Sequence, residues 1–341
     1  MAQQKLTIKD IAKLAQVSPS SVSMVINGRD GLSDTTKERI LRTIKEKNYY
    51  PSASSQRLVS RKSFNIPFMY PIEMSPFSDF FYNEVARGLV EELTLNNFNV
   101  VFVPLLVNDG NIEVPSIINK RDADAAILMH DAPQAIIDKL DELELPYVLL
   151  DWQQDTHGCA NIDLDNQRST YRAVNYLIQM RHTKIALLGS ERQPQFFLRC
   201  FNGYSKALGE AQLPVHPGWI QSSVHDVDSA VSTIKKLMET DADSRPTAVC
   251  CTNDYIAIFA LKAAALLNIS VPDELSFIGK DDVSVSSYIY PELTTVSYDK
   301  AKIGKETALV LLRMLEGEIV GDVVMGGGPI IERKSVALNL K

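Results

Sequence analysis

The sequence predicts a small all-α helix-turn-helix domain followed by an α/β body of two doubly wound parallel sheets. Residues 6–27 hold two short helical patterns joined by a tight turn. From residue 64 onward, short apolar runs alternate with amphipathic helical runs, which is typical of parallel strands covered by helices. At 341 residues the chain is longer than a single domain with one hydrophobic core usually is, and a small domain followed by two sheets accounts for this length.

The first helical pattern starts after Thr7, which can cap it, and Asp10 three residues later completes a capping-box spacing. Ser18 is a second N-cap, and Pro19 takes the first position of the next helix, where its missing N–H costs nothing. Apolar residues of both helices face a shared core, namely Ile8, Ile11, Ala12, Ala15, Val22, Val25 and Ile26.

The second helix leaves a short-armed polar face outside this core, and such a face suits close approach to a DNA groove. A plain three-helix bundle with an exposed serine face is the alternative interpretation. The face consists of Ser20, Ser21, Ser23 and Met24.

A third helix is expected from Asp34 to Lys47, capped by Ser33 and stopped before Pro51. The residues from 52 to 62 have helical propensity but almost no apolar face, so we expect them to fray when free of DNA. The third helix completes the small core with Ile40, Leu41 and Ile44. The predicted division is a headpiece at 1–50, a linker at 51–63 and a body at 64–341.

The charge is unevenly divided along the chain. Residues 1–62 carry 12 Lys and Arg against five acidic residues, a net +7, whereas the formal net charge of the whole chain is -7. A basic head on an acidic body is what a phosphate-binding module needs, although a basic surface can also serve solvation alone. Together with the helix-turn-helix pattern, the charge favours nucleic acid as a partner.

Several classes of protein are not expected. No run approaches the roughly 18 apolar residues of a membrane span, and the N-terminus lacks the apolar core of a signal peptide, so a cytoplasmic protein is expected. Cys250 and Cys251 lie in an apolar run as reduced core residues, and no metal site or cofactor is expected. Neither a nucleophile elbow nor a dinucleotide-binding glycine motif is present, so an enzyme is not expected.

In an open parallel sheet, ligands bind beyond the carboxyl ends of the strands. Seven strands are expected, at 65–70, 99–104, 125–129, 147–151, 184–188, 248–252 and 275–278. Polar and aromatic residues follow them, and this mixture suits a polyhydroxylated ring. Taken one at a time, these residues could equally be helix caps, core or turn residues. The candidates are Phe81, Tyr82, Asp151, Trp152, the stretch 189–199 with Arg199, Asn253, Asp254, Lys280, Asp281 and Asp282.

Four long motifs resemble the lactose-repressor (LacI/GalR) family of bacterial transcription regulators, and the resemblance covers essentially the whole chain. They are TIKDIAKLAQVSPSSVSMVIN, DTTKERILRTIKEKNYYP, TAVCCTNDYIAIFALKAAALLNISVPDELSFIGKDD and PELTTVSYDKAKIGKETALVLLRMLEG. The resemblance implies a DNA-binding transcriptional regulator, most simply a repressor, whose body is a periplasmic-binding-protein-like (type I) pair of subdomains with a small-molecule effector between them.

The resemblance also implies roles for the residues of the headpiece and linker. The second helix would read bases with Pro19, Ser20 and Met24. The linker would form a hinge helix on DNA, with Leu58 as the wedge that opens the minor groove, although Ser55 and Gln56 depart from the usual Ala and Arg. Phosphate contacts would come from Thr7, Ser18, Ser21, Ser23, Asn27 and Thr36.

In the body, the resemblance implies an N-subdomain at about 64–162 plus 292–322 and a C-subdomain at about 163–291 plus 323–341. Two departures from the family pattern concern the effector. Cys200 replaces the usual effector arginine, with Arg199 one position early, and Lys280 replaces an aromatic residue. Either Lys280 pairs with a neighbouring carboxylate, the alternative we favour from the sequence, or the effector is anionic, as a uronate or phosphosugar would be.

The partners implied are double-stranded operator DNA, a carbohydrate-like effector and a second copy of the chain in a homodimer, with no membrane. The effector would shift the protein between two states by its differential affinity for them. The alternatives are a regulator that answers to a protein coregulator or a nucleobase, and a solute-binding protein, which would leave the basic head unexplained.

Overall fold

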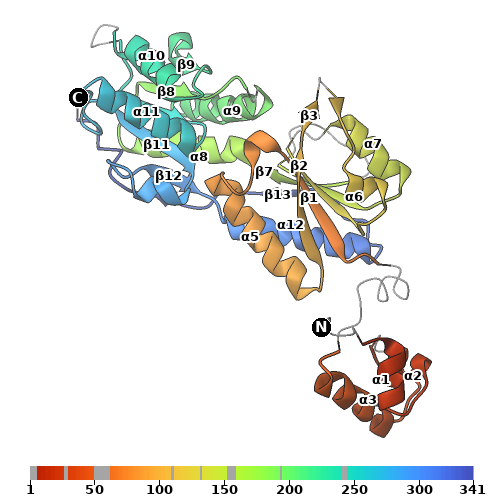
Figure 1. Ribbon diagram of the computed structural model, residues 1–341. Helices are drawn as coiled ribbons and strands as arrows, with labels where there is room; N and C mark the ends of the chain where they lie inside the picture. The colour runs from red at the N-terminus through yellow and green to blue at the C-terminus, as the bar shows by residue number, and fades with distance from the viewer. Residues whose placement is uncertain are drawn as a thin grey trace. The chain divides into compact units, whose positions relative to one another are not determined.

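The computed structural model describes residues 6–26, 30–49, 62–108, 111–130, 133–151, 159–192, 194–239 and 244–340. The chain divides into two compact units, Met1–Ser63 and Phe64–Lys341. We call the first the headpiece and the second the body (Figure 1). Residues 51–61 of the linker predicted at 51–63, including Leu58, lie outside the described residues, as do Asn27 and Trp152.

The headpiece is built from α1 (Ile8–Leu14), α2 (Pro19–Ile26) and α3 (Asp34–Glu46). Thr7 caps α1, and Asp10 completes the predicted capping box. Leu41 is 47% exposed, so its predicted place in the core is wrong; the α-helical period turns it away from the face that buries Ile40. The buried core consists of Ile11, Ala12, Ala15, Val22, Val25, Ile40 and Tyr49.

The body holds two six-stranded sheets, and with the headpiece they confirm the predicted fold class. The first sheet has the order β13-β7-β6-β5-β1-β2, and all its neighbours pair in parallel. Its central strands are buried from end to end, as expected of strands covered on both faces. The strands are β1 (Asn65–Pro71), β2 (Asn99–Leu105), β5 (Ala126–Met129), β6 (Tyr147–Leu150), β7 (Ala160–Leu164) and β13 (Val323–Met325).

The second sheet has the order β14-β12-β11-β10-β8-β9, and only the pair of β12 with β14 is antiparallel. Its strands are β8 (Ile185–Leu188), β9 (Ile220–Gln221), β10 (Ala248–Cys251), β11 (Ser276–Asp281), β12 (Thr294–Ser297) and β14 (Ile330–Ile331). A separate hairpin joins β3 (Val107–Asn108) to β4 (Asn111–Ile112).

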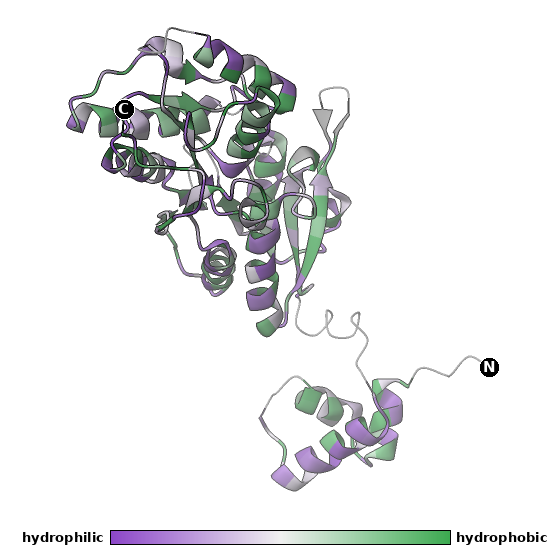
Figure 2. Cartoon of the chain, turned by 90° about the vertical axis from the view of Figure 1, so that its left-hand side faces the viewer, coloured by the Kyte–Doolittle hydropathy of each residue, from purple (hydrophilic) through white to green (hydrophobic). Residues whose placement is uncertain are grey.

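Helices lie over both sheets (Figure 1), and the strands are coloured largely as hydrophobic while the helices carry both colours (Figure 2). The first half of the body has α5 (Phe80–Leu95), α6 (Ser116–Asn119), α7 (Gln134–Glu142) and α12 (Lys300–Leu315). The second half has α8 (Asn166–Gln179), α9 (Pro194–Glu210), α10 (Val227–Met238) and α11 (Asp254–Leu266). Short 3-10 turns occur at Ile72–Met74, Pro217–Trp219 and Ser284–Ser287.

The crossings between the halves lie later in the chain than the sequence indicated. The prediction placed 292–322 in the first half, but β12 pairs with β11 of the second sheet. It placed 323–341 in the second half, but β13 pairs with β7 of the first sheet. The chain therefore crosses after β7, after β12 and after β13, because each of these short strands pairs with its sheet before the chain leaves it.

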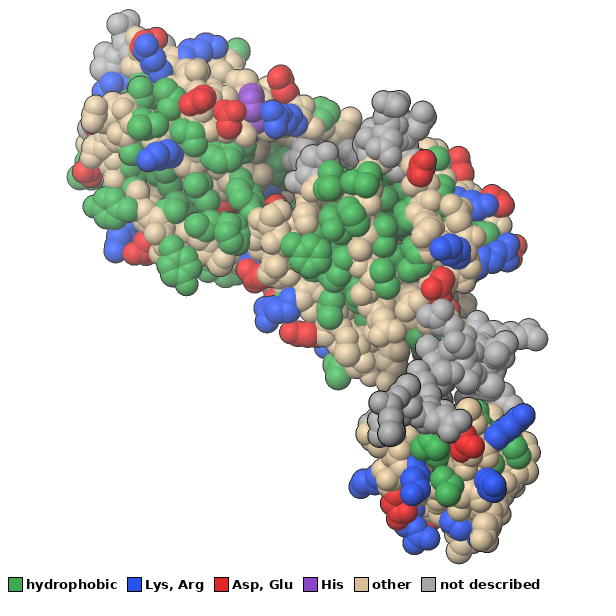
Figure 3. All heavy atoms as spheres, viewed as in Figure 1, with side chains coloured by type: hydrophobic (Ala, Val, Ile, Leu, Met, Phe, Trp, Pro, Cys, Tyr) green, Lys and Arg blue, Asp and Glu red, His purple; other side chains and the backbone are tan. Residues whose placement is uncertain are grey.

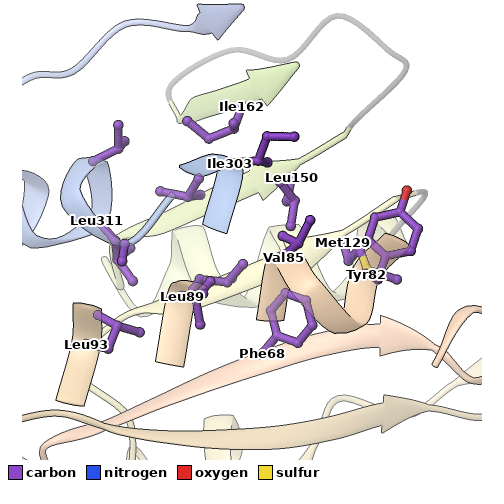
Figure 4. Packing of buried hydrophobic residues seen from close by; sticks show 14 of the residues in the cluster. Phe68, Tyr82, Val85, Leu89, Leu93, Met129, Leu150, Ile162, Ile303 and Leu311 are labelled. Carbon is purple, nitrogen blue, oxygen red and sulfur yellow. The ribbon is translucent and has the colours of Figure 1, made fainter. Parts of the chain in front are cut away.

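Helices α5 and α12 pack closely over the first sheet. A Cβ added at Gly304 would lie 1.9 Å from the Val85 carbonyl oxygen, and one at Gly88 would lie 2.0 Å from the Ala301 carbonyl oxygen. Figure 4 shows Val85 and Leu89 of α5 near Ile303 of α12, above strand residues such as Phe68. The two glycines let the helix backbones approach, and this packing fixes the N-terminal end of α5 beside the carboxyl ends of the strands.

Among the helices that the structure describes, none combines the length and the apolar character needed to span a membrane. The described residues also contain no group of three or more His, Cys, Asp or Glu side chains that could hold a metal ion.

Candidate functional site

The exposed face of α2 carries the predicted base-reading residues. Pro19 and Ser20 are exposed, and Met24 is half-buried. The Ser18 hydroxyl accepts a hydrogen bond from the Ser21 amide at 3.1 Å and lies 2.7 Å from the Ser20 hydroxyl. The N-terminus of α2 is therefore capped locally, with small side chains around it and no acidic residue in its first turn. A helix N-terminus of this kind accommodates phosphate or a base edge.

The other predicted phosphate-contacting residues of the headpiece are mostly N-terminal caps or their neighbours. Thr7 caps α1, and the Thr36 hydroxyl lies 2.9 Å from the Ser33 hydroxyl at the start of α3. Ser23 lies half-buried on α2. Figure 3 shows Lys and Arg side chains over the visible face of this unit, in agreement with its positive charge.

In the body, a cavity lies at the carboxyl ends of the strands, between the two halves. Most of the effector residues predicted from the sequence meet there. It is lined by Met74, Asp79, Phe81, Tyr82, His130, Asp151, Leu164, Asn166, Phe196, Asn253, Tyr255 and Asp281. We call Tyr82, His130 and Asp151 the first wall, and Asn166, Phe196 and Lys280 the second wall; Lys280 lies directly behind the other two.

The first wall is a closed hydrogen-bonding group. Tyr82 on α5 donates from its hydroxyl to Asp151 Oδ2 at 2.7 Å, and the same hydroxyl contacts His130 Nε2. Burial and the Asp151 carboxylate raise the pKa of Tyr82 well above its ordinary value, so the hydroxyl keeps its proton. His130 and Asp151 follow β5 and β6 at φ 54° each, a region that non-glycine residues adopt mainly at turns and functional sites.

The second wall is built around a buried cation. Lys280 on β11 is 1% exposed, and its Nζ donates to Asn166 Oδ1 at 2.5 Å. The same Nζ lies 4.4 Å from the centre of the Phe196 ring and 3.7 Å from Cys200 Sγ. No carboxylate lies within 4 Å of it among the residues that the structure describes. The expected salt bridge of Lys280 is therefore wrong, because the nearest acceptor is an amide.

Arg199 does not line the cavity. Its guanidinium instead forms an ion pair with Asp163 Oδ2 at 2.6 Å, joining α9 of the second half to β7 of the first. Burial raises the pKa of Asp163, and the pairing with Arg199 partly opposes this. The prediction that Arg199 contacts the effector is therefore wrong, because the Asp163 carboxylate, between the two halves, holds its side chain.

Asp281 and Asn253 are both in the cavity. Asn253 caps α11, since its Oδ1 accepts from the Ile256 amide at 2.9 Å. It is therefore both a helix cap, as the alternative interpretation had it, and a residue that lines the cavity. Asp281 has φ 117°, and Lys300 Nζ binds its carbonyl oxygen at 2.9 Å. Burial raises the pKa of Asp281 well above its ordinary value, with Lys280 opposing this shift.

Asp254, which follows Asn253, does not line the cavity but holds the loop after β11. Its carboxylate accepts from the Val283 amide at 3.0 Å and from the hydroxyls of Ser286 at 2.7 Å and Thr295 at 2.6 Å. Burial raises the pKa of Asp254 to about 6. Asp254 therefore supports the backbone that presents Asp281.

Sequence reasoning missed His130, Asn166 and Phe196. His130 follows β5 directly, so a search of every strand end would have included it. Asn166 follows β7, which was not recognised as a strand. Phe196 lies in the first turn of α9, within the broad stretch 189–199 that was predicted only as a whole.

Known proteins match the chain along nearly its whole length. Residues 7–52 match the family model "Bacterial regulatory proteins, lacI family", and residues 174–336 match "Periplasmic binding protein-like domain". The ribose operon repressor of Haemophilus influenzae is 31% identical over 91% of this chain and 92% of its own length. The chain belongs to the lacI family of bacterial regulatory proteins.

A further relative agrees with this membership, and a solved structure agrees with the fold. The HTH-type transcriptional repressor PurR of Vibrio cholerae is 30% identical over 91% of this chain and 91% of its own. The lac repressor dimer bound to operator and the anti-inducer ONPF has a TM-score of 0.79 at 21% identity, covering 98% of this chain and 100% of that one. As a lacI-family protein, the chain is a DNA-binding transcriptional regulator controlled by a small-molecule effector.

Proposed function

We propose that this lacI-family protein is a repressor that binds operator DNA as a homodimer and answers to a carbohydrate-like ligand in the cavity of the body. The observation that carries the proposal is the presence, in one chain, of a capped helix-turn-helix and a polar, aromatic cavity between two half-domains. No catalytic role is assigned to any residue of the cavity.

For DNA, the proposal assigns base contacts to Pro19, Ser20 and Met24 on α2. Supporting it, Pro19 and Ser20 are exposed at the N-terminal end of the helix that would enter the groove. The hinge role of Leu58 is proposed from the sequence alone. The proposed phosphate contacts are Thr7, Ser18, Ser21, Ser23, Asn27 and Thr36.

For the effector, a sugar is supported by the mixture of aromatic faces and carboxylates in the cavity, since ring hydroxyls donate to carboxylates and ring faces stack on aromatic side chains. The relatives point the same way, because they include a ribose operon repressor and a solved "transcriptional regulator CelR-cellobiose complex". A nucleobase is the second candidate, favoured by the four aromatic residues Phe81, Tyr82, Phe196 and Tyr255 around the cavity.

For the assembly, exposed hydrophobic side chains of the body support a dimer. Tyr288 is 84% exposed, Tyr290 is 94% exposed and Leu95 is 78% exposed. Figure 3 shows hydrophobic side chains gathered on one face over both halves of the body. Hydrophobic side chains gathered on one face fit contact with a second copy. A dimer would let the effector alter the spacing of two headpieces, in proportion to its differential affinity for the two spacings.

The test is selection of genomic DNA fragments by the full chain, followed by gel shifts on the fragments that are enriched. Ser20→Glu, which places a negative charge against DNA, is expected to abolish the gel shift of these fragments. Ser232→Glu adds the same charge on exposed α10 in the body and is the matched control. An equal gel shift with both variants would contradict the assignment of α2 to DNA.

A further inference from the structure

The second wall of the cavity leaves one polar group without a partner. Asn166 is 2% exposed and lines the cavity, and its Nδ2 has no hydrogen-bond partner among the described residues. A buried amide N–H₂ without an acceptor is costly, and natural proteins rarely keep one without a reason.

Lys280 fixes the orientation of this amide. Because its ammonium donates to Asn166 Oδ1 at 2.5 Å, rotating the amide by 180° would direct the N–H₂ group at a cation. The donor therefore stays on the side away from Lys280. An acceptor that a ligand of the cavity brings to that side would satisfy the donor, which no described protein atom does.

The charge behind the amide favours an anionic acceptor. Lys280 is held by an amide oxygen and an aromatic face and lies within 4 Å of no carboxylate among the described residues. Its field at the cavity is therefore not cancelled by a direct ion pair, and a donor polarised by a cation binds a carboxylate oxygen more strongly than a neutral one.

We infer that the effector is a sugar acid, a uronate or an aldonate, whose carboxylate accepts from Asn166 Nδ2 in front of Lys280. This inference rests on the proposed function of the cavity and names the class of its ligand. The hydroxyl groups of such a molecule would face the carboxylates of Asp151 and Asp281, which line the same cavity. The Asp151 carboxylate also favours a carboxylate over a phosphate on the ligand, since a single negative charge meets less repulsion than two.

The first experiment compares matched ligands on the purified full-length protein without DNA. Thermal-shift and calorimetric titrations use D-glucuronate with D-glucose, D-galacturonate with D-galactose, and D-gluconate with D-sorbitol, together with D-ribose, D-glucose 6-phosphate and hypoxanthine. At least one acid is expected to bind tenfold or more tightly than its neutral parent. Binding by no acid, equal binding by acid and parent, or tighter binding by ribose, the phosphate or hypoxanthine would each overturn the inference.

The second experiment tests the roles of the two residues. Lys280→Met is expected to lower the affinity for the bound acid at least tenfold, while Lys302→Met, at an exposed position on α12, leaves it unchanged. The double variant Lys280→Met/Asn166→Leu is expected to lose the acid response and melt no lower than the wild type. A lower melting temperature would mean that the pair serves the fold, which overturns the inference. Operator binding by the wild-type chain tests the proposed function separately.

Discussion

The two walls of the cavity differ in how far their polar groups satisfy one another. On the first wall, Tyr82 bridges Asp151 and His130, so the group holds its own geometry. On the second wall, Lys280 uses the oxygen of Asn166 and leaves the nitrogen of the same amide without a described partner. The polar groups of the first wall are already paired with one another and present a fixed surface to a ligand. The amide nitrogen of Asn166 instead favours ligands that bring a hydrogen-bond acceptor. The second wall is therefore where we expect ligand identity to be decided.

The largest effect is expected from Asn166→Leu, which breaks the second wall. The substitution removes the oxygen that accepts from Lys280 and leaves a buried ammonium with no hydrogen-bonding oxygen among the described residues. The free energy of unfolding should fall by about 3 kcal/mol, because a buried charged donor that loses its acceptor stays desolvated without a hydrogen bond to that oxygen. Urea denaturation of the full chain measures it.

The matched variant for this prediction carries Lys280→Met as well. Without the ammonium, Asn166→Leu should cost less than about 1 kcal/mol, because two apolar side chains then meet in the same space. The double-mutant cycle reports the coupling. If Asn166→Leu costs the same with Met at position 280, the two side chains are independent and the contrast between the walls is lost.

A smaller effect is expected from Tyr82→Phe on the first wall. Deleting the hydroxyl leaves Asp151 Oδ2 and His130 Nε2 without this shared partner and should cost about 1–3 kcal/mol of unfolding free energy. Thr183→Val is the control, since it deletes a hydroxyl at an exposed position before β8, outside both walls. Equal denaturation midpoints for the two variants would show that the first wall is not a closed group.

The contrast between the walls could not be predicted from the sequence, although most of the fold could. Alternating strands and helices, the caps Thr7 and Ser33, and the buried runs of the central strands are local signals, and the structure confirms them. The short strands β7, β12 and β13 were missed because three to five residues give little periodicity. Their pairing decides where the chain crosses between the halves, so the crossings were misplaced.

The candidate site was predicted as a set of strand ends, and five of its members do line one cavity. They are Phe81, Tyr82, Asp151, Asn253 and Asp281. The partners of charged residues could not be predicted, because they lie far along the chain. Arg199 donates to Asp163 over 36 residues, and Lys280 donates to Asn166 over 114 residues. Local sequence shows only that a carboxylate is adjacent to Lys280, and a β-strand points adjacent side chains to opposite faces.

The smallest effect is a pH response that arises outside both walls and must be separated from any pH dependence of ligand binding. His182, before β8, is 3% exposed; its Nδ1 lies 2.9 Å from Thr247 Oγ1, and its Nε2 lies 3.0 Å from the Ala337 carbonyl oxygen. Burial lowers the pKa of His182 below its ordinary value of 6.5.

The sign of this response follows from proton linkage. Below pH 6.5 the unfolded chain takes up a proton at His182 that the folded chain does not, so the stability present above that pH falls as the pH drops toward the folded pKa. Between pH 7.5 and pH 5.5, the urea midpoint should therefore fall more for the wild type than for His182→Gln, which cannot take up the proton. The same fall in both proteins would place the response in other groups. If so, the raised pKa values of Asp254 and Asp281 could not account for it, because carboxyl groups that keep their protons longer in the folded chain make it more stable, not less, as the pH drops.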